Sequence, residues 1–384
     1  MKLALSALCE HPGRKTGLTT LFHEFVSHAL ALYPELDWIV FAGPGQEWSV
    51  ESPRVRVVRD YPANDHLARR LLADHFLVPA AAKRLGAAAL LTVGFVPLRK
   101  SLPTIMQLFS LQHLQPSNQV GLARAVYRRL IVDRSVDRAD RIIVNSQFAA
   151  GQVRAAFPRC ADRLTISYEG MQHEQFTPDA PADEAAALKE KFGLAPGYLF
   201  WASNFYPYKQ ADLLLAAYTR LPAETRAAHP LVMVGGGWYG GMDAARAYTA
   251  ALGIADDVHF LGWIDDRWLA PLYRHARAFC LASREETFGR CVAEAMACGT
   301  PCVVNRIPIM DEVTGGHALV VDYADPVAAA GALGSLLADD GVHARLREEG
   351  IAWVARFSFD RLARERVDAI LATLGRAGGA ANGG

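Results

Sequence analysis

The chain has 384 residues, of which 51% are apolar, and its 40 basic residues are balanced by 40 acidic ones. This composition excludes a disordered chain and a nucleic-acid-binding protein with a strong overall basic field. The length exceeds that of a usual single core, so two domains are expected, and the chain contains no uninterrupted apolar run long enough to span a bilayer.

The first half of the chain alternates short apolar runs with segments of helical pattern. The opening apolar run ends at Glu10 without a cleavage-like site, which favours a first strand over a secretory signal. A turn containing Gly17 follows, and then a helix. Further strands are predicted at residues 38–42, 55–59, 88–93 and 104–108, with a helix at 66–85. This alternation is typical of a doubly wound α/β sheet.

A polar loop follows the strand predicted at residues 104–108, and it contains His113. Because ligands bind beyond the carboxyl ends of strands in such sheets, His113 is either a ligand-facing residue or a residue that caps the loop. A helix carrying several arginines is predicted next, at residues 121–139.

The basic residues are unevenly distributed along the chain. Residues 1–170 contain 21 Lys and Arg against 14 Asp and Glu, whereas the remainder contains 19 against 26. This asymmetry has two interpretations. The arginines form a solvated face, or the first domain binds anionic lipid or a phosphate-bearing acceptor.

In the second half, three predicted strands are each followed by a distinctive turn. Residues 198–202 precede a turn containing Asn204 and Lys209, and residues 231–234 precede three glycines that include Gly235. The strand at residues 258–262 precedes Trp263, which either packs in the core or is available for stacking on a ligand.

Residues 279–305 read as strand, turn, helix and strand, the pattern of a buried parallel βαβ unit. The turn carries Glu285 and Glu286, and the helix carries Glu294. Carboxylates at this edge favour a ligand that offers hydroxyl groups. In the alternative interpretation, Glu294 only pairs with Arg290 one turn earlier, and the other two acids are solvated.

Residues 286–301, E-T-F-G-R-C-V-A-E-A-M-A-C-G-T-P, closely resemble the E-x(7)-E signature of the retaining GT-B glycosyltransferases of family 4. Thr287 replaces the usual glycine of that signature and Arg290 the usual leucine. Weaker resemblances to the same family occur at residues 140–146, 166–176, 203–209, 231–237, 258–265 and 357–371.

The resemblance implies a GT-B architecture, in which two Rossmann-like, doubly wound parallel-sheet domains face each other across a cleft. The acceptor-side domain would comprise residues 1–172 and a C-terminal helix at about 357–374, which crosses back to it. The donor-binding domain would comprise residues 173–356. The glycine- and alanine-rich residues 375–384 are expected to form a disordered tail.

The resemblance also implies roles for particular residues. Glu286 would lie beside the donor sugar, Lys209 would neutralise the departing diphosphate, and His113 completes the expected catalytic set. Glu294 would hold the ribose. The other expected donor contacts are Gly17, Asn204, Gly235, Trp263, Phe288, Gly289 and Arg290.

The implied function is transfer of a sugar from a nucleotide-diphosphate donor, UDP- or GDP-linked, to a hydroxyl acceptor with retained anomeric configuration. The acceptor would be a glycan, a lipid-linked or anionic molecule, or another small molecule, as in cell-envelope glycoconjugate synthesis. Two alternatives share the architecture: a nucleotide-sugar epimerase, and a non-catalytic nucleotide-sugar-binding protein suggested by Asn204 and Thr287.

No metal and no other cofactor is expected, because the chain contains no Asp-x-Asp sequence. Its six cysteines include no Cys-x-x-Cys, and no histidine has the spacing of a zinc site, so they are interpreted as small buried residues. Reduced cysteines imply a cytoplasmic protein, with peripheral contact at the inner membrane face through the basic first domain.

Overall fold

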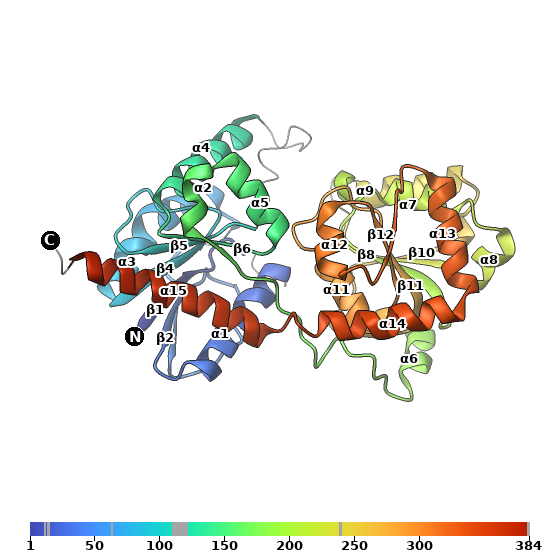
Figure 1. Cartoon of the computed structure of the whole chain (residues 1–384), viewed down its shortest axis with the longest axis horizontal. Coiled ribbons are helices and arrows are strands. Elements are labelled where there is room, and N and C mark those ends of the chain that lie inside the picture. The colour runs from blue at the N-terminus through green and yellow to red at the C-terminus, as the bar shows by residue number, and fades with distance from the viewer. Residues whose placement is uncertain (11–12, 14–15, 63, 110–121, 238–239, 382–384) are drawn as a thin grey trace. The chain divides into compact units, whose positions relative to one another are not determined.

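The structure is a computed structural model that describes residues 1–10, 13, 16–62, 64–109, 122–237 and 240–381 (Figure 1). The chain divides into two compact units. Unit 1 comprises Met1–Gly170 and Phe357–Gly384, and unit 2 comprises Met171–Arg356. The division after Gly170 lies two residues before the boundary expected from the sequence.

In its described residues, unit 1 contains a sheet of seven parallel strands in the order β3-β2-β1-β4-β5-β6-β7. The strands are β1 (Lys2–Ser6), β2 (Asp37–Phe41), β3 (Val55–Val58), β4 (Ala87–Val93), β5 (Thr104–Gln107), β6 (Arg141–Val144) and β7 (Leu164–Ile166). The helices are α1 (Gly17–Leu32), α2 (Leu67–Leu72), α3 (Val78–Arg84), α4 (Leu122–Arg138), α5 (Gln147–Ala156) and α15 (Phe359–Ala381), with the short helical segments η1 (Ala73–Leu77) and η3 (Pro158–Arg163).

Helices cover both faces of this sheet because alternate side chains of each strand point to opposite faces. On one face, Leu5 and Ile105 share a core with Phe25 of α1 and Leu362 of α15. Figure 1 shows α15 lying along α1. The last helix of the chain therefore belongs to unit 1, as predicted.

The other face of the sheet is covered in two parts. Next to β2 and β4, Ile39 and Leu90 pack on Val78 of α3. Next to β5 and β6, Met106 and Ile142 pack on α4 and α5. Both faces are thus buried, which agrees with the nearly continuous apolar runs of the strands.

The helix predicted at residues 66–85 is interrupted by one π-helical turn, η1, between α2 and α3. This turn directs Asp74 and His75 inward, and both are buried. Ser6 Oγ donates a hydrogen bond of 2.6 Å to Asp74, and Arg70 lies 3.9 Å from the same carboxylate. A polar interaction with the end of β1 therefore accompanies the extra residue in the helical turn.

Helix α15 continues to Ala381, so residues 375–381 are helical where the composition predicted disorder. Each residue added to an existing helix forms a hydrogen bond without a new nucleation step, so the helix continues although Gly375, Gly378 and Gly379 disfavour it.

The chain passes from one unit to the other twice, after Gly170 and before Phe357. These two points lie next to each other in unit 1. A Cβ atom on Gly170 would lie 2.4 Å from the ring of Phe359, and the rings of Tyr168 and Phe357 are 5.6 Å apart. Only glycine therefore fits at residue 170 without displacing the start of α15.

In its described residues, unit 2 contains six parallel strands in the order β10-β9-β8-β11-β12-β13. They are β8 (Tyr198–Ala202), β9 (Leu231–Val234), β10 (Val258–Gly262), β11 (Ala276–Leu281), β12 (Cys302–Asn305) and β13 (Leu319–Val321). The helices are α6 (Glu184–Phe192), α7 (Ala211–Tyr218), α8 (Ala223–Ala228), α9 (Gly241–Ala251), α10 (Leu269–Arg274), α11 (Arg290–Ala297), α12 (Pro308–Thr314), α13 (Pro326–Ala338) and α14 (Asp340–Val354), with the 3₁₀ turns η4 (Pro207–Lys209), η5 (Ala255–Asp257) and η6 (Asp266–Trp268).

Unit 2 has its own core on each face of its sheet. Trp201 and Met233 pack against Leu214 of α7 and Leu333 of α13 on one face. On the other face, the rings of Phe200 and Tyr273 lie 5.1 Å apart. Both units are therefore parallel-sheet α/β domains, as the sequence predicted, whereas a cleft between them stays a prediction.

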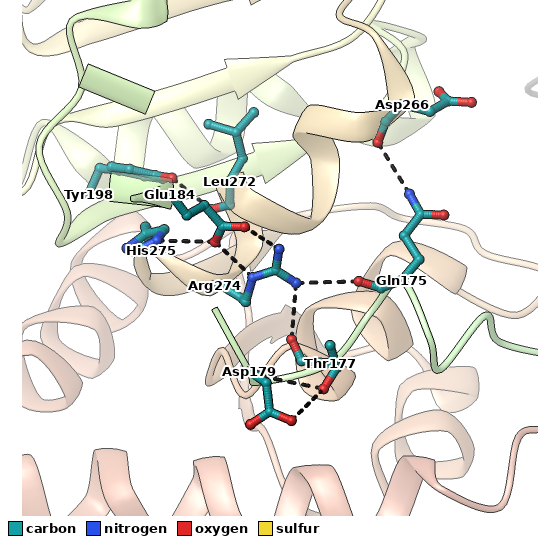
Figure 2. Close-up of polar contacts among 9 residues, drawn as sticks. All are labelled: Gln175, Thr177, Asp179, Glu184, Tyr198, Asp266, Leu272, Arg274 and His275. Carbon is teal, nitrogen blue, oxygen red and sulfur yellow. Dashed lines mark hydrogen bonds and ion pairs between the residues drawn. The ribbon is translucent and has the colours of Figure 1, made fainter. Parts of the chain in front are cut away.

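The segment that enters unit 2 is held by a polar network around Arg274 of α10 (Figure 2). Arg274 forms an ion pair with Glu184 and donates hydrogen bonds to the carbonyls of Gln175 and Thr177. His275 lies 3.2 Å from the same carboxylate. Glu184 is buried, and its partner Arg274 lies ninety residues later in the chain.

Candidate functional site

The strand order of unit 2 places the loops after β8 and β11 next to each other. These strands are neighbours in the sheet, although β9 and β10 separate them in the chain. In an open parallel sheet, this reversal of strand order leaves a crevice at the carboxyl ends of the strands, where ligands bind. The turns with Asn204 and Lys209, and with Glu285 and Glu286, follow these two strands.

Hydrogen bonds join the two loops to each other and to the next strand. The Arg284 amide donates to the Tyr208 carbonyl at 2.8 Å. The Asn305 side chain, at the end of β12, donates to the Ser283 carbonyl at 3.2 Å. These bonds fix the backbone on both sides of the crevice before any ligand arrives.

Lys209 and Glu286 form an ion pair across the crevice, with 2.6 Å between Nζ and Oε1. Both side chains are largely buried, since only about a tenth of each is accessible to solvent. Burial alone would lower the pKa of Lys209, but its neighbours, chiefly the Glu286 carboxylate, together outweigh burial and raise the pKa. Lys209 therefore stays an ammonium group at neutral pH, in contact with Glu286.

Helix α11 begins directly after the acidic turn. Its N-cap is Gly289, whose φ of 96° disfavours any residue with a side chain. Phe288 is buried beneath the turn. The N-terminus of α11 therefore lies beside Glu286, and the first residue of the helix is Arg290.

Glu294 lies one turn into α11 and is buried. Its Oε2 accepts a hydrogen bond of 3.2 Å from the Tyr273 hydroxyl, and its Oε1 lies 3.7 Å from Arg290. Burial raises the pKa of Glu294, although Arg290 and the Tyr273 hydroxyl oppose the shift. The pair with Arg290 that the alternative interpretation proposed is thus present, but Glu286, which that interpretation left solvated, is largely buried.

The loops after β9 and β10 lie at the same edge of the sheet. Gly235 has a φ of 137°, and a Cβ atom there would lie 1.8 Å from the Ser203 carbonyl oxygen. A Cβ atom on Gly236 would lie 2.2 Å from the Trp263 indole nitrogen. These two glycines let the β9 loop approach both the β8 turn and the indole closely.

Trp263 is 67% exposed, so the interpretation of this residue as part of the core is wrong. It follows the last residue of β10, where the chain leaves the sheet, and its indole rests against glycine backbone. This arrangement leaves much of a large planar aromatic surface accessible at the ligand edge.

The structure brings most of the predicted site residues to this one edge of unit 2. The residues that follow its strands or begin α11 are Asn204, Lys209, Gly235, Trp263, Glu286, Phe288, Gly289, Arg290 and Glu294. Gly17 belongs to unit 1, where it is the first residue of α1 rather than part of a turn. His113 lies outside the described residues.

Sequence reasoning missed two residues that support the site. Tyr273 donates to Glu294, and Asn305 holds the turn after β11. Tyr273 lies in an apolar helix and gave no polar signal. Asn305 is a polar residue at the carboxyl end of an apolar strand. Residues of a ligand site usually lie there in a parallel sheet, so its position could have identified it as a site residue.

The cysteines are unpaired, and Cys280, Cys298 and Cys302 are buried around α11. Burial raises the pKa of Cys280 to about 12, which makes its thiol unreactive at neutral pH. In the part of the chain that the structure describes, no three His, Cys, Asp or Glu side chains gather as potential metal ligands.

The segment of unit 2 that contains this edge matches a known protein family. Residues 196–339 match the family described as glycosyl transferases group 1. The matched segment includes all the predicted site residues of unit 2.

Curated relatives match a longer part of the chain. A D-inositol 3-phosphate glycosyltransferase from Xylanimonas cellulosilytica is 34% identical over 249 residues, which is 62% of this chain and 58% of that protein. O-antigen chain mannosyltransferase B of Escherichia coli is 30% identical over 248 residues, 64% of each chain. The chain thus spans about three fifths of the length of these relatives.

Solved structures match nearly the whole chain. Sucrose-phosphate synthase from Thermosynechococcus elongatus has a TM-score of 0.80 at 22% identity and covers 98% of this chain and 99% of its own. Anabaena HepE in complex with UDP-glucose has a TM-score of 0.72 at 17% identity and covers 97% and 100%. Together with the two parallel-sheet units, these similarities show that the fold is GT-B.

Among the described residues, no helix has both the length and the apolar character that crossing a membrane would require.

Proposed function

We propose that the protein transfers a sugar from a nucleotide-diphosphate donor to a hydroxyl group of an acceptor. The observation that carries this proposal is the Lys209–Glu286 pair at the β8–β11 crevice, within the segment that matches the glycosyltransferase family. A donor sugar diphosphate offers both an anion for the lysine and hydroxyl groups for the carboxylate.

In this proposal, Lys209 exchanges its carboxylate partner for the diphosphate, and the first amides of α11 add positive potential beside it. Glu286 then accepts hydrogen bonds from the sugar hydroxyls and stabilises positive charge that develops at the anomeric carbon. The acceptor hydroxyl attacks that carbon and the bond to the diphosphate breaks. The leaving phosphate takes the acceptor's proton on the same face, which retains the anomeric configuration.

The nucleoside would occupy the two flanks of the crevice. Glu294 accepts hydrogen bonds from the ribose hydroxyls, and the exposed face of Trp263 stacks on the base. Arg290 supplies the cationic group that Asn204 does not provide, because it begins α11 beside the crevice. Gly17, at the N-terminus of α1, would contribute backbone amides to the diphosphate.

The similarity to HepE, solved with UDP-glucose, supports a UDP-sugar donor, and a GDP-sugar stays the alternative. The names of the curated relatives support a hydroxyl acceptor that carries a phosphate or belongs to a growing cell-envelope glycan. We place this activity in the cytoplasm, where nucleotide sugars are made.

The decisive experiment incubates the protein with UDP- and GDP-sugars and measures nucleoside diphosphate release with and without a mixture of sugar and polyol acceptors. Acceptor-dependent release, absent in Lys209→Ala, is expected. Release of an altered nucleotide sugar without acceptor would instead show an epimerase. Binding without turnover of any donor would show a nucleotide-sugar-binding protein.

We also propose that catalysis needs no divalent metal, because Lys209 and the α11 amides supply the charge that a metal would otherwise bring. Addition of excess EDTA to the same assay is expected to leave the rate within twofold. A loss of activity that Mg²⁺ or Mn²⁺ restores would contradict this part of the proposal.

We further propose that unit 1 contacts an anionic membrane surface through an apolar stripe formed by Leu67, Leu72, Phe76 and Leu77. These side chains of α2 and η1 are all exposed. Exposed basic residues lie within and after this segment, namely Arg69, Lys83 and Arg84. Apolar side chains bordered by cations are suited to the interface of an anionic bilayer.

Sedimentation with vesicles tests this contact. Binding to phosphatidylcholine vesicles that contain phosphatidylglycerol is expected to fall at least fivefold in a Leu72→Gln/Phe76→Gln variant. The control is Leu130→Gln, which removes an exposed leucine from α4 instead. Equal losses in both variants, or no binding by the unchanged protein, would remove the stripe from consideration.

A further inference from the structure

Unit 1 contains a cavity at the carboxyl-terminal edge of its own sheet. The cavity has a volume of about 600 Å³. Its wall is formed by residues 45–49, in the loop that follows β2, and by Arg59, which directly follows β3. Ligands bind at this edge of an open parallel sheet. The donor contacts proposed above include none of these residues.

The loop after β2 is held in place by the buried side chain of Gln46. Its amide nitrogen donates hydrogen bonds to the carbonyls of Ala7, at 3.3 Å, and Glu10, at 2.6 Å, both in the segment after β1. Its amide oxygen accepts a hydrogen bond from the backbone of Gly43. The cavity wall is therefore fixed before a ligand binds, which reduces the conformational entropy lost on binding.

Trp48 supplies an aromatic surface to the cavity wall. Its indole is half-buried and meets the ring of His23 of α1 edge-on, with the ring centroids 4.5 Å apart. Ser49, the next residue, forms a hydrogen bond of 2.8 Å with His23 Nδ1. The indole nitrogen of Trp48 is buried and, within the part of the chain that the structure describes, has no hydrogen-bond acceptor. Trp48 is thus an anchored aromatic side chain with an unused donor.

The cavity wall carries little net charge. Among the described residues, Arg59 is its cation and Glu47 its acid, and both are exposed. Arg59 Nη1 donates to the carbonyls of Gly43, at 3.5 Å, and Gln46, at 2.5 Å, which orient the guanidinium group without neutralising it. Glu47 repels an anion that Arg59 attracts, whereas a neutral ligand with hydroxyl groups can hydrogen-bond to both side chains.

We propose that this cavity binds a neutral sugar ring of the acceptor, so that the acceptor is a saccharide. The apolar face of the ring packs on the Trp48 indole, and its hydroxyl groups form charge-assisted hydrogen bonds with Arg59 and Glu47. The volume lies within the range of small-molecule sites, about 300 to 1,000 Å³. The role as acceptor site rests on the proposed sugar transfer, whereas saccharide binding itself does not.

Saturation-transfer NMR with the methyl glycosides of glucose, galactose and mannose tests this binding in the absence of any donor. At least one of the three is expected to bind. Arg59→Gln should raise its Kd at least fivefold, because a charge-assisted hydrogen bond is lost, and Trp48→Leu should do so because the aromatic surface is lost. The matched control is Arg56→Gln, which removes an exposed arginine of β3 that does not line the cavity and should change the Kd less than twofold.

An unaltered Kd in Arg59→Gln, equal losses in Arg59→Gln and Arg56→Gln, or no binding of any methyl glycoside would overturn the proposal. Binding of glucose 6-phosphate alone would do the same, because the phosphate would then be the recognised group. The melting temperature of each variant shows whether it is folded. Arg59→Gln keeps the test valid even if Trp48→Leu does not fold, because Arg59 is exposed.

The role in sugar transfer is tested by measuring nucleoside diphosphate release with the bound methyl glycoside as acceptor. Arg59→Gln should raise the KM for the acceptor at least fivefold and leave the KM for the donor within twofold. A rise in the donor KM instead would remove the cavity from acceptor binding. The two proposals fail separately, because glycoside binding is measured without donor, and donor turnover is measured with a mixture of acceptors.

Discussion

At the scale of single residues, the candidate site depends on two opposite charges that the chain brings together from distant positions. Lys209 follows β8 and Glu286 follows β11, and their contact satisfies both groups in the absence of a ligand. Glu285, the neighbouring acid, lies 3.7 Å from Arg284 instead. The two adjacent acids therefore have different partners and are expected to differ in function.

Replacement of Glu286 by Gln is expected to lower turnover about 10²- to 10³-fold, the usual cost of removing one preorganised electrostatic contact. The measurement is the nucleoside diphosphate release described above, with circular dichroism to check the fold. Glu285→Gln is the matched control and should stay within about threefold of the unchanged protein. Similar rates for the two variants would remove Glu286 from the site.

Asp74 gives a prediction about pH. It is 2% exposed, and burial raises its pKa from 3.8 to about 6, although Ser6 and Arg70 oppose the shift. The unfolded chain therefore loses this proton at a lower pH than the folded chain does. The contribution of Asp74 to stability should fall as the pH rises from about 4 to 6, by at most about 3 kcal/mol, and stay constant above that range.

Thermal unfolding of Asp74→Asn across this pH range checks that assignment. The variant should lack the decrease, because an amide does not titrate. Asp65→Asn, an exposed acid near the start of the same helical segment, should keep the decrease seen in the unchanged protein. A decrease that persists in Asp74→Asn would assign it to another group.

At the scale of elements, the site depends on loops that approach each other too closely for side chains. Gly235 is the strongest case, since its backbone conformation and the Ser203 carbonyl both exclude a Cβ atom. The loop after β9 is thereby held against the turn that leads to Lys209.

Gly235→Ala is expected to destabilise unit 2 by about 3 to 5 kcal/mol, because backbone must move to relieve the contact. The control is Gly253→Ala, which has a φ of 70° and no atom near the added Cβ, and it should cost only about 1 to 2 kcal/mol. Urea unfolding followed by tryptophan fluorescence measures both. Equal costs would show that the close approach does not constrain the loop.

The sequence predicted the elements better than the contacts between them. Spacing and apolar runs identified the strand, turn and helix around Glu286, because these features depend on neighbouring residues. The contact of Glu286 with Lys209 joins residues 77 positions apart, and no local pattern reports such a distance. The ion pair between Glu184 and Arg274 gives no local signal for the same reason, since the two residues lie in different elements.

Trp263 shows a different limit. Its apolar character suggested the core equally well, because hydropathy does not tell whether a residue is the last inside a strand or the first outside it. The π-helical turn at Asp74 likewise had no signal in a segment with continuous helical character. Resemblance to known motifs supplied the expected roles of site residues, which physical patterns alone left open.

At the scale of the whole molecule, the two units differ in how the chain builds them. Unit 2 is one continuous segment with its own core, whereas unit 1 needs residues from both ends of the chain. The separate cores make each unit a potential independent folding domain. The proposed donor contacts, except Gly17, all lie in unit 2.

A fragment of residues 171–356 is therefore expected to fold and to bind a nucleoside diphosphate within about tenfold of the full chain's affinity. A fragment of residues 1–170 lacks α15 and should unfold or aggregate, because Phe22 and Phe25 lose their partners. Differential scanning calorimetry and titration measure these outcomes. A folded 171–356 fragment without affinity would show that unit 1 supplies most of the nucleotide binding.

Helix α15, which completes the core of unit 1, is translated long after the elements on which it packs. More than three hundred residues separate helix α1 from α15, so the apolar surface that α15 covers stays open until those residues have been translated. At ordinary rates of translation, this interval lasts on the order of tens of seconds. The apolar surface of the nascent N-terminal half must therefore be shielded during that time. The yield of folded protein in cells should then depend on chaperones that bind nascent chains.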